Sequence, residues 1–267
     1  MPILGVSRES SEPVDFIVWG DSHCRVLGTM IESLGKEHGL SCAMAAKIAT
    51  PPLIGIWQPD KQDEAIGAPA WNDFVMQYIR DNRVSNVFLI SRWTLYLEGN
   101  FHGNMRRLIA DEQSVHTDRE NAKAVFRASL TRTLDELEKL GARVWIMKQV
   151  PNQYYSPKYR VARAVLRGQE IPKGVSAAIH RDRQKTANSI IDAVAKGREG
   201  VLVCDPVEYC FDELGYSRIA NEEGIFYRDG DHLCHLGANR LLRPMFESAL
   251  VNEMRVSSRK MGRPSMR

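Results

Sequence analysis

The chain has 267 residues, of which 43% are hydrophobic and 26% are charged, and its formal net charge is +3. This composition is typical of a globular protein with a full core, and it excludes a chain that is disordered throughout. Residues 255–267 carry five basic side chains and no acidic one. The rest of the chain is therefore close to neutral, and its charge gives no argument for nucleic-acid binding.

The five cysteines include no Cys-x-x-Cys pair, so they indicate neither a disulfide framework nor a zinc ribbon. No apolar run is long enough to span a bilayer. The N-terminus lacks the charged and apolar regions of a secretory signal. We expect residues 1–14 to be a lead-in, residues 15–254 to be one domain, and residues 255–267 to be a basic tail.

Short apolar segments rich in β-branched and aromatic residues alternate with segments of helical periodicity. The first strand is predicted over residues 15–19, and the helix that follows over residues 23–37 ends at Gly39. Further strands are predicted over residues 41–48, 84–90, 143–147 and 201–204. Further helices are predicted over residues 71–80, 119–140 and 176–195, and a last helix begins near His235.

Strands that alternate with helices predict a parallel sheet with both faces covered. We therefore expect an α/β fold, a three-layer α/β/α sandwich whose parallel sheet has about five strands in flavodoxin-like order. Residues 97–118 and 152–174 have no clear place in that sheet, and long ordered connections of this kind are often functional. Eight basic residues with interleaved tyrosines lie between residues 152 and 185. This pattern indicates either contact with an anionic glycan or a solvated face.

The tetrapeptide Gly20-Asp21-Ser22-His23 lies between the first strand and the first helix. Ligands of open α/β sheets bind beyond the carboxyl ends of the strands. The free N–H groups and the dipole of a helix N-terminus favour negative charge at that place. Ser22 is therefore a candidate nucleophile, and the structural alternative is that Asp21 or Ser22 only caps the helix.

A second polar segment, residues 227–238, offers partners for Ser22. A serine hydroxyl needs a histidine that takes its proton and usually a carboxylate that orients the histidine. Asp229 and His232 lie three residues apart on a predicted loop, so one segment can supply both. The alternative is a metal site made with Asp231, Cys234 and His235, but the chain has no spaced Cys/His cluster to complete it. We expect neither a metal nor another cofactor.

Gly-Asp-Ser-His near the start and Asp-x-x-His-Leu near the end resemble the first and last motif blocks of the SGNH (GDSL-type) hydrolases. The chain is more similar still to the SGNH domain that follows the membrane acyltransferase-3 domain in bacterial carbohydrate O-acyltransferases. The likeness extends from residue 15 to about residue 250. The segments that carry it are residues 19–23, 51–53, 87–93, 150–151 and 229–238.

This resemblance implies that Ser22 is the nucleophile, His232 the general base and then acid, and Asp229 its orienting carboxylate. The Ser22 backbone N–H would be one oxyanion donor. The implied reaction is transfer of an acyl group, expected to be acetyl, through an acyl-serine to or from carbohydrate hydroxyls. The implied partners are a carbohydrate and a membrane acyltransferase-3 domain as acyl donor.

One family motif is missing, because the third strand runs into Ser91-Arg92-Trp93 and not into Gly-x-Asn-Asp. Arg92 is our candidate for the lost oxyanion donor, since a guanidinium is a permanent cation with several N–H groups. A structural ion pair is the alternative role for Arg92. Asp21, His23 and Trp93 are candidates for substrate binding. The missing motif also leaves open a catalytically silent glycan-binding module that serves a membrane acyltransferase.

The resemblance also bears on location. In the subfamily, the SGNH domain lies on the extracytoplasmic face of the membrane and is tethered by transmembrane helices. We expect the present sequence to be a portion of such a longer chain, which would be periplasmic. A free-standing relative would instead be cytoplasmic.

Overall fold

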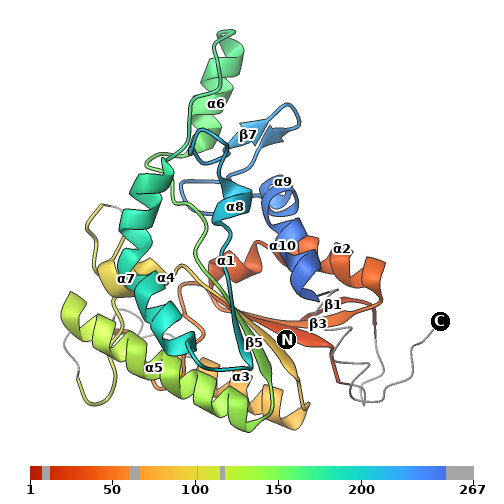
Figure 1. Cartoon of the computed structure of the whole chain (residues 1–267), viewed down its shortest axis with the longest axis vertical. Coiled ribbons are helices and arrows are strands. Elements are labelled where there is room, and N and C mark those ends of the chain that lie inside the picture. Colours follow the sequence, from red (N-terminus) through yellow and green to blue (C-terminus); the bar gives the residue numbers. More distant parts are fainter. Residues whose placement is uncertain (8–12, 60–66, 101, 115–117, 251–267) are drawn as a thin grey trace.

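A six-stranded sheet forms the centre of the structure, a computed structural model that describes residues 1–7, 13–59, 67–100, 102–114 and 118–250 (Figure 1). The strand order is β1-β3-β2-β4-β5-β6, and all neighbours are parallel except β1 and β3. The strands are β1 (Ile3–Gly5), β2 (Phe16–Gly20), β3 (Ser41–Ala46), β4 (Asn86–Ile90), β5 (Arg143–Met147) and β6 (Val201–Cys204). The five parallel strands have the flavodoxin-like order that the sequence predicts.

Strand β1 lies within residues 1–14, which the sequence indicates as a lead-in and where it predicts no strand. Ile3 pairs with Ala43 of β3 in antiparallel register, and the Gly5 N–H donates to a carboxylate oxygen of Glu32 at 2.7 Å. A strand of three residues is too short to show an alternating pattern. The sheet therefore has one edge strand more than the sequence reveals. The expected basic tail, residues 255–267, lies outside the described residues.

Helices cover both faces of the sheet, as the continuous apolar runs of its central strands require. One face packs against α3, α4, α5 and α7, and the other against α1, α2 and α10. The helices are α1 (Ser22–Arg25), α2 (Gly28–His38), α3 (Ala68–Asp81), α4 (Trp93–Glu98), α5 (Arg119–Lys139), α6 (Pro157–Leu166), α7 (Ala177–Ala195), α8 (Val207–Cys210), α9 (His235–Gly237) and α10 (Arg243–Glu247), with a π-helical turn at Ala238–Leu242 and a hairpin of β7 (Ala220–Asn221) and β8 (Gly224–Ile225). The three-layer α/β/α prediction is confirmed.

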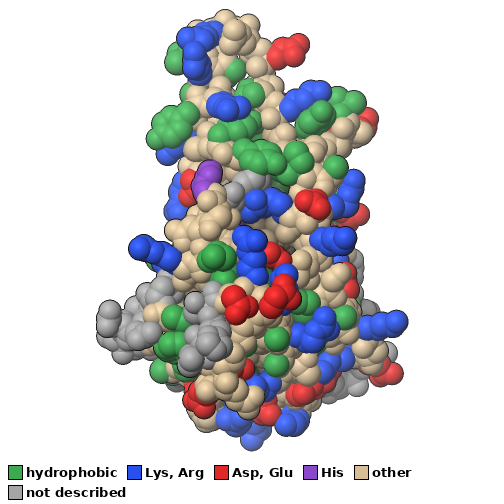
Figure 2. Space-filling view, turned by 90° about the vertical axis from the view of Figure 1, so that its left-hand side faces the viewer, with side chains coloured by type: hydrophobic (Ala, Val, Ile, Leu, Met, Phe, Trp, Pro, Cys, Tyr) green, Lys and Arg blue, Asp and Glu red, His purple; other side chains and the backbone are tan. Residues whose placement is uncertain are grey.

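The stretch from residue 152 to residue 174 contains α6, which the sequence analysis does not predict. This helix projects beyond the sheet at one end of the molecule (Figure 1). Val161 and Ala164 are buried, whereas Tyr159 and Leu166 are 70% and 87% exposed. Basic and hydrophobic side chains lie together at that end in Figure 2. Among the described residues, no helix combines the length and the apolar character needed to cross a membrane.

Candidate active site

Ser22 lies at the carboxyl end of β2, where the chain turns directly into α1. Gly20 permits the close approach of β2 to β4 at this point, because a Cβ at that position would lie 1.7 Å from the carbonyl oxygen of Ile90 in β4. Asp21 caps α1 by accepting the His23 N–H at 2.8 Å. Ser22 is therefore the first residue of a capped helix, and a backbone N–H in that position has no acceptor within the helix.

The structure brings Ser22, His232 and Asp229 into one hydrogen-bonded chain. The Ser22 Oγ lies 2.8 Å from Nε2 of His232. The other ring nitrogen of His232, Nδ1, lies 3.0 Å from Oδ2 and 3.1 Å from Oδ1 of Asp229. This arrangement activates a serine, because the base lies within hydrogen-bond reach of the nucleophile and the carboxylate orients the base.

A tight loop before α9 supplies both His232 and Asp229. The Asp229 Oδ1 accepts the backbone N–H groups of Asp231 at 3.0 Å and of His232 at 2.8 Å. The Arg228 N–H donates to the His232 carbonyl oxygen at 2.9 Å, and Tyr227 forms an isolated bridge with Leu233. The Asp229 carboxylate thus orients the His232 ring and also fixes the loop that carries it.

Charge and burial act together on the acid and the base. Burial alone would raise the pKa of Asp229, but hydrogen bonds from the His232 ring and two backbone N–H groups hold it well below its usual range. Burial alone would lower the pKa of His232, but the bond to Asp229 and the charges of Asp229 and Asp231 raise it above its usual value. Asp229 is thus an anion, and His232 is a strengthened base.

Asp21 connects the end of β2 to the end of β4. Its Oδ2 accepts hydrogen bonds from Ser91 Oγ at 2.8 Å, Arg92 N–H at 2.9 Å and Tyr96 Oη at 2.7 Å. Only 1% of the Asp21 surface is exposed. Asp21 therefore braces the backbone on both sides of Ser22, and the Arg92 N–H is not available to an oxyanion.

Asp231 joins Arg92 and His23 beside the triad. Its Oδ2 lies 2.8 Å from Nη1 of Arg92 and 3.3 Å from Nε2 of His23. Its Oδ1 lies 3.7 Å from Nδ1 of His232. Burial opposes ionisation of Asp231, but its bond to His23 and the Arg92 charge lower its pKa. The Arg92 side chain thus ties the end of β4 to the catalytic loop, as an ion pair.

The burial of three expected substrate ligands corrects the sequence analysis. Asp21, His23 and Trp93 are 1%, 4% and 0% exposed. The indole N–H of Trp93 donates to the Met147 carbonyl oxygen at 2.7 Å, so this side chain joins β5 to α4 within the core. The sequence does not distinguish an aromatic residue at the end of a strand that packs inward from one that faces a ligand.

The metal alternative does not assemble as its sequence pattern suggested. Cys234 Sγ donates to the Ile225 carbonyl oxygen at 2.9 Å, and His235 pairs with Asn239. A different group, His23, Asp231 and His232, has ligand-type atoms within 4.8 Å of one another. His232 Nε2 in this group is already the partner of Ser22. A metal there would have to take the base away from the nucleophile.

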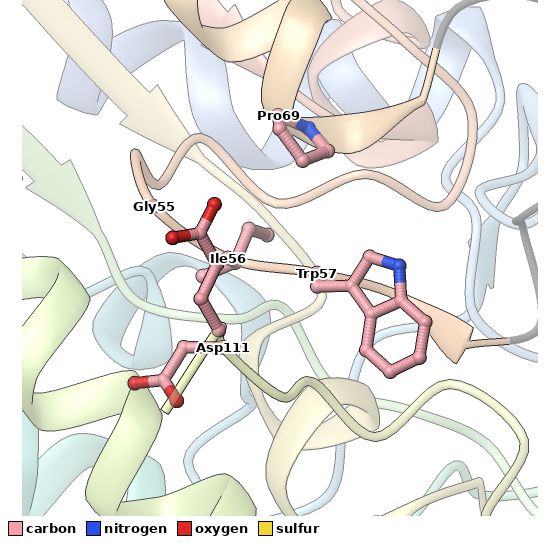
Figure 3. Close-up of a pocket in the computed structure, with 6 residues that line it drawn as sticks. Gly55, Ile56, Trp57, Pro69 and Asp111 are labelled. Atoms are coloured by element: carbon pink, nitrogen blue, oxygen red, sulfur yellow. The ribbon is translucent and has the colours of Figure 1, made fainter. Parts of the chain in front are cut away.

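One cavity lies at the carboxyl edge of the sheet, and another lies beside α3. The first, a polar cavity of about 280 Å³, adjoins the catalytic loop, and its lining includes Arg92, Asp231 and Asn152. No sequence motif marks Asn152; the only sequence signal is that it lies five residues beyond the carboxyl end of β5. The other cavity, of about 320 Å³, is lined by Gly55, Ile56, Trp57, Pro69, Asp111 and Glu112 (Figure 3). Neither lining includes Ser22, Asp229 or His232.

Comparison with known proteins decides the family. Residues 4–248 match the family model described as the SGNH domain fused to AT3 domains. The chain belongs to this SGNH family. It is therefore an enzyme of the SGNH acyltransferase and esterase class. No curated protein is similar enough to this SGNH domain to count as a match.

Solved structures share the fold of this SGNH domain. The periplasmic domain of the lipopolysaccharide acetyltransferase of Salmonella ser. Paratyphi A is 13% identical, with a TM-score of 0.63 over 92% of this chain and 90% of that chain. A GDSL-like lipase from Bacteroides thetaiotaomicron is 9% identical, with a TM-score of 0.50 over 93% and 92% of the two chains. Both are distant in sequence, so the likeness is one of fold.

Proposed function

We propose that this SGNH domain transfers an acyl group, most simply acetyl, to or from a carbohydrate hydroxyl through an acyl-serine on Ser22. The observation that supports this most is the unbroken chain from Ser22 Oγ through His232 to Asp229. A silent binding module would have no use for a serine held 2.8 Å from a histidine whose pKa is raised.

The first half-reaction forms the acyl-serine. Ser22 Oγ attacks the ester carbonyl carbon while its proton passes to Nε2 of His232, and the imidazolium that forms is stabilised by Asp229. When the tetrahedral intermediate collapses, the bond to the leaving alcohol breaks and that alcohol takes the proton from His232. In the second half-reaction, water or a sugar hydroxyl attacks the acyl carbon, gives its proton to His232, and Ser22 leaves and recovers a proton.

The tetrahedral intermediates carry a negative oxygen that needs hydrogen-bond donors. The Ser22 N–H, at the first position of α1, is one donor in our account. The Arg92 guanidinium is our candidate for a second, since its cation lines the cavity beside the catalytic loop. Its ion pair with Asp231 uses Nη1 and leaves other N–H groups of the same fork.

The proposed substrate and partner follow from the family. The matched family is described as an SGNH domain fused to AT3 domains, and the Salmonella structure is named as the periplasmic domain of a lipopolysaccharide acetyltransferase. We therefore propose a polysaccharide substrate, an AT3 domain as the source of the acyl group, and an extracytoplasmic location.

Hydrolysis of 4-nitrophenyl acetate tests the proposed chemistry. Ser22→Ala and His232→Ala should each reduce kcat/KM by about 10⁴-fold or more, because members of a triad act as a unit. Asp229→Asn should cost less than either. Asn239→Ala, which removes the partner of His235, is the control and should retain activity. Full activity in Ser22→Ala would overturn the proposal.

A further inference from the structure

The polar cavity of about 280 Å³ lies directly beside the catalytic loop, since Gly230 and Asp231 are part of its wall. Arg92 contributes to the same wall. The rest of the lining comes from Asn100 and His102, which follow α4, and from residues 152–156, which follow β5. Amide, hydroxyl, imidazole and guanidinium groups thus surround a space that borders the loop between Asp229 and His232.

Asn152 is the side chain in this wall whose hydrogen bonds are unaccounted for. It is 6% exposed, and within the described part of the chain its amide has no hydrogen-bond partner. The Ser156 Oγ in the same wall is buried and likewise has no partner there. The Ser156 Oγ is closed to solvent and therefore to a ligand as well. The Asn152 carboxamide in the cavity wall is the group that can hydrogen-bond a ligand there.

The backbone on both sides of Asn152 is fixed to the catalytic loop. The Tyr227 hydroxyl donates to the Pro151 carbonyl oxygen at 3.0 Å. The Gln153 N–H donates to the Gly230 carbonyl oxygen at 2.6 Å. Asn152 is therefore held at a set position relative to His232 although its own side chain is unpaired. Such preorganisation lowers the entropic cost of binding a ligand.

We infer that this cavity holds the alcohol part of the substrate, one sugar unit with free hydroxyls, and that Asn152 binds one of those hydroxyls. A carboxamide offers both donors and an acceptor, as a hydroxyl does. The volume lies at the lower end of ligand pockets, about 300 Å³, which suits a single ring. The inference rests on the proposed function. The bound sugar hydroxyl attacks the acyl carbon of the acyl-serine and passes its proton to His232. The bond to Ser22 Oγ then breaks, and Ser22 recovers that proton from His232.

Partitioning of the acyl-enzyme tests the inference. The protein is acylated with 4-nitrophenyl acetate in the presence of methyl α-glucoside, methyl α-galactoside or methyl α-mannoside, and the acetylated glycoside and free acetate are quantified. For at least one glycoside, transfer should exceed transfer to methanol at equal concentration. Asn152→Ala and the larger, apolar Asn152→Leu should each lower the ratio of transfer to hydrolysis about fivefold, the effect of one lost hydrogen bond.

Asn86→Ala is the matched control, because Asn86 lies at the amino end of β4, at the opposite edge of the sheet. Its ratio should equal that of the wild type. Transfer no better than to methanol, or a ratio unchanged in both Asn152 variants, would overturn the inference. Release of 4-nitrophenol by the wild type but not by Ser22→Ala reports separately on the proposed function, so the two failures are distinguishable.

Discussion

A serine gives up its proton only to a base that is already in place, and His232 is held in place from two sides. Asp229 binds its Nδ1, and the charge of Asp231 lies 3.7 Å from the same atom. Arg92 and His23 in turn hold Asp231. Two carboxylates, and not one, therefore set the basicity of the catalytic histidine.

This arrangement predicts the pH dependence of the reaction. Because the pKa of His232 is raised and only the neutral ring accepts a proton, kcat/KM should rise with pH through a midpoint above about 6.5, the usual value for histidine. Asp231→Asn removes a negative charge from beside the ring, and the midpoint should then fall. A pH profile of 4-nitrophenyl acetate hydrolysis measures both. A midpoint that does not move in Asp231→Asn would exclude this carboxylate from the control of His232.

The role of Arg92 in the reaction can also be tested by substitution. If its guanidinium stabilises the oxyanion, Arg92→Ala should lower kcat by about 10²-fold with little change in KM, and Arg92→Lys should recover part of the loss. Steady-state kinetics and a melting temperature are the measurements. An unchanged kcat with a lowered melting temperature would instead assign to Arg92 only the ion pair with Asp231.

At the scale of elements, the approach of β2 to β4 positions the nucleophile. Gly20→Ala would put a Cβ against the backbone oxygen of Ile90, which no side-chain rotation relieves. The variant should lose about 3 kcal/mol or more of unfolding free energy and most of its activity. Gly200→Ala is the matched control, because a Cβ there lies 3.8 Å from the Ala142 oxygen, an ordinary contact. Urea denaturation compares them, and equal stabilities would contradict this account of the β2–β4 contact.

The sequence predicts some of the helices and strands better than others. The five parallel strands and the long helices α5 and α7 carry strong periodic patterns, and they form at the predicted places. The predicted helix over residues 23–37 is divided into α1 and α2 by a turn at Val26 and Leu27. Strand β1 is not predicted because it has only three residues. Helix α6 is not predicted because it exposes apolar side chains.

Across the whole molecule, the site is assembled from segments more than two hundred residues apart in sequence. Ser22 and the pair of Asp229 and His232 could be found from local motifs, because each motif is a few residues long. The Asp231 contacts to Arg92 and His23, and the place of Asn152 beside them, depend on how four segments meet at the carboxyl edge of the sheet. No local pattern records such a meeting.

The most direct test of the central claim is reaction with a fluorophosphonate probe, followed by peptide mass spectrometry to locate the label. A serine activated by His232 and Asp229 reacts with such a probe, whereas an ordinary capping serine does not. We predict stoichiometric labelling of Ser22 in the wild type, and its loss in His232→Ala, where the hydroxyl remains but the base is gone. An unlabelled wild-type Ser22, or equal labelling in His232→Ala, would contradict the triad.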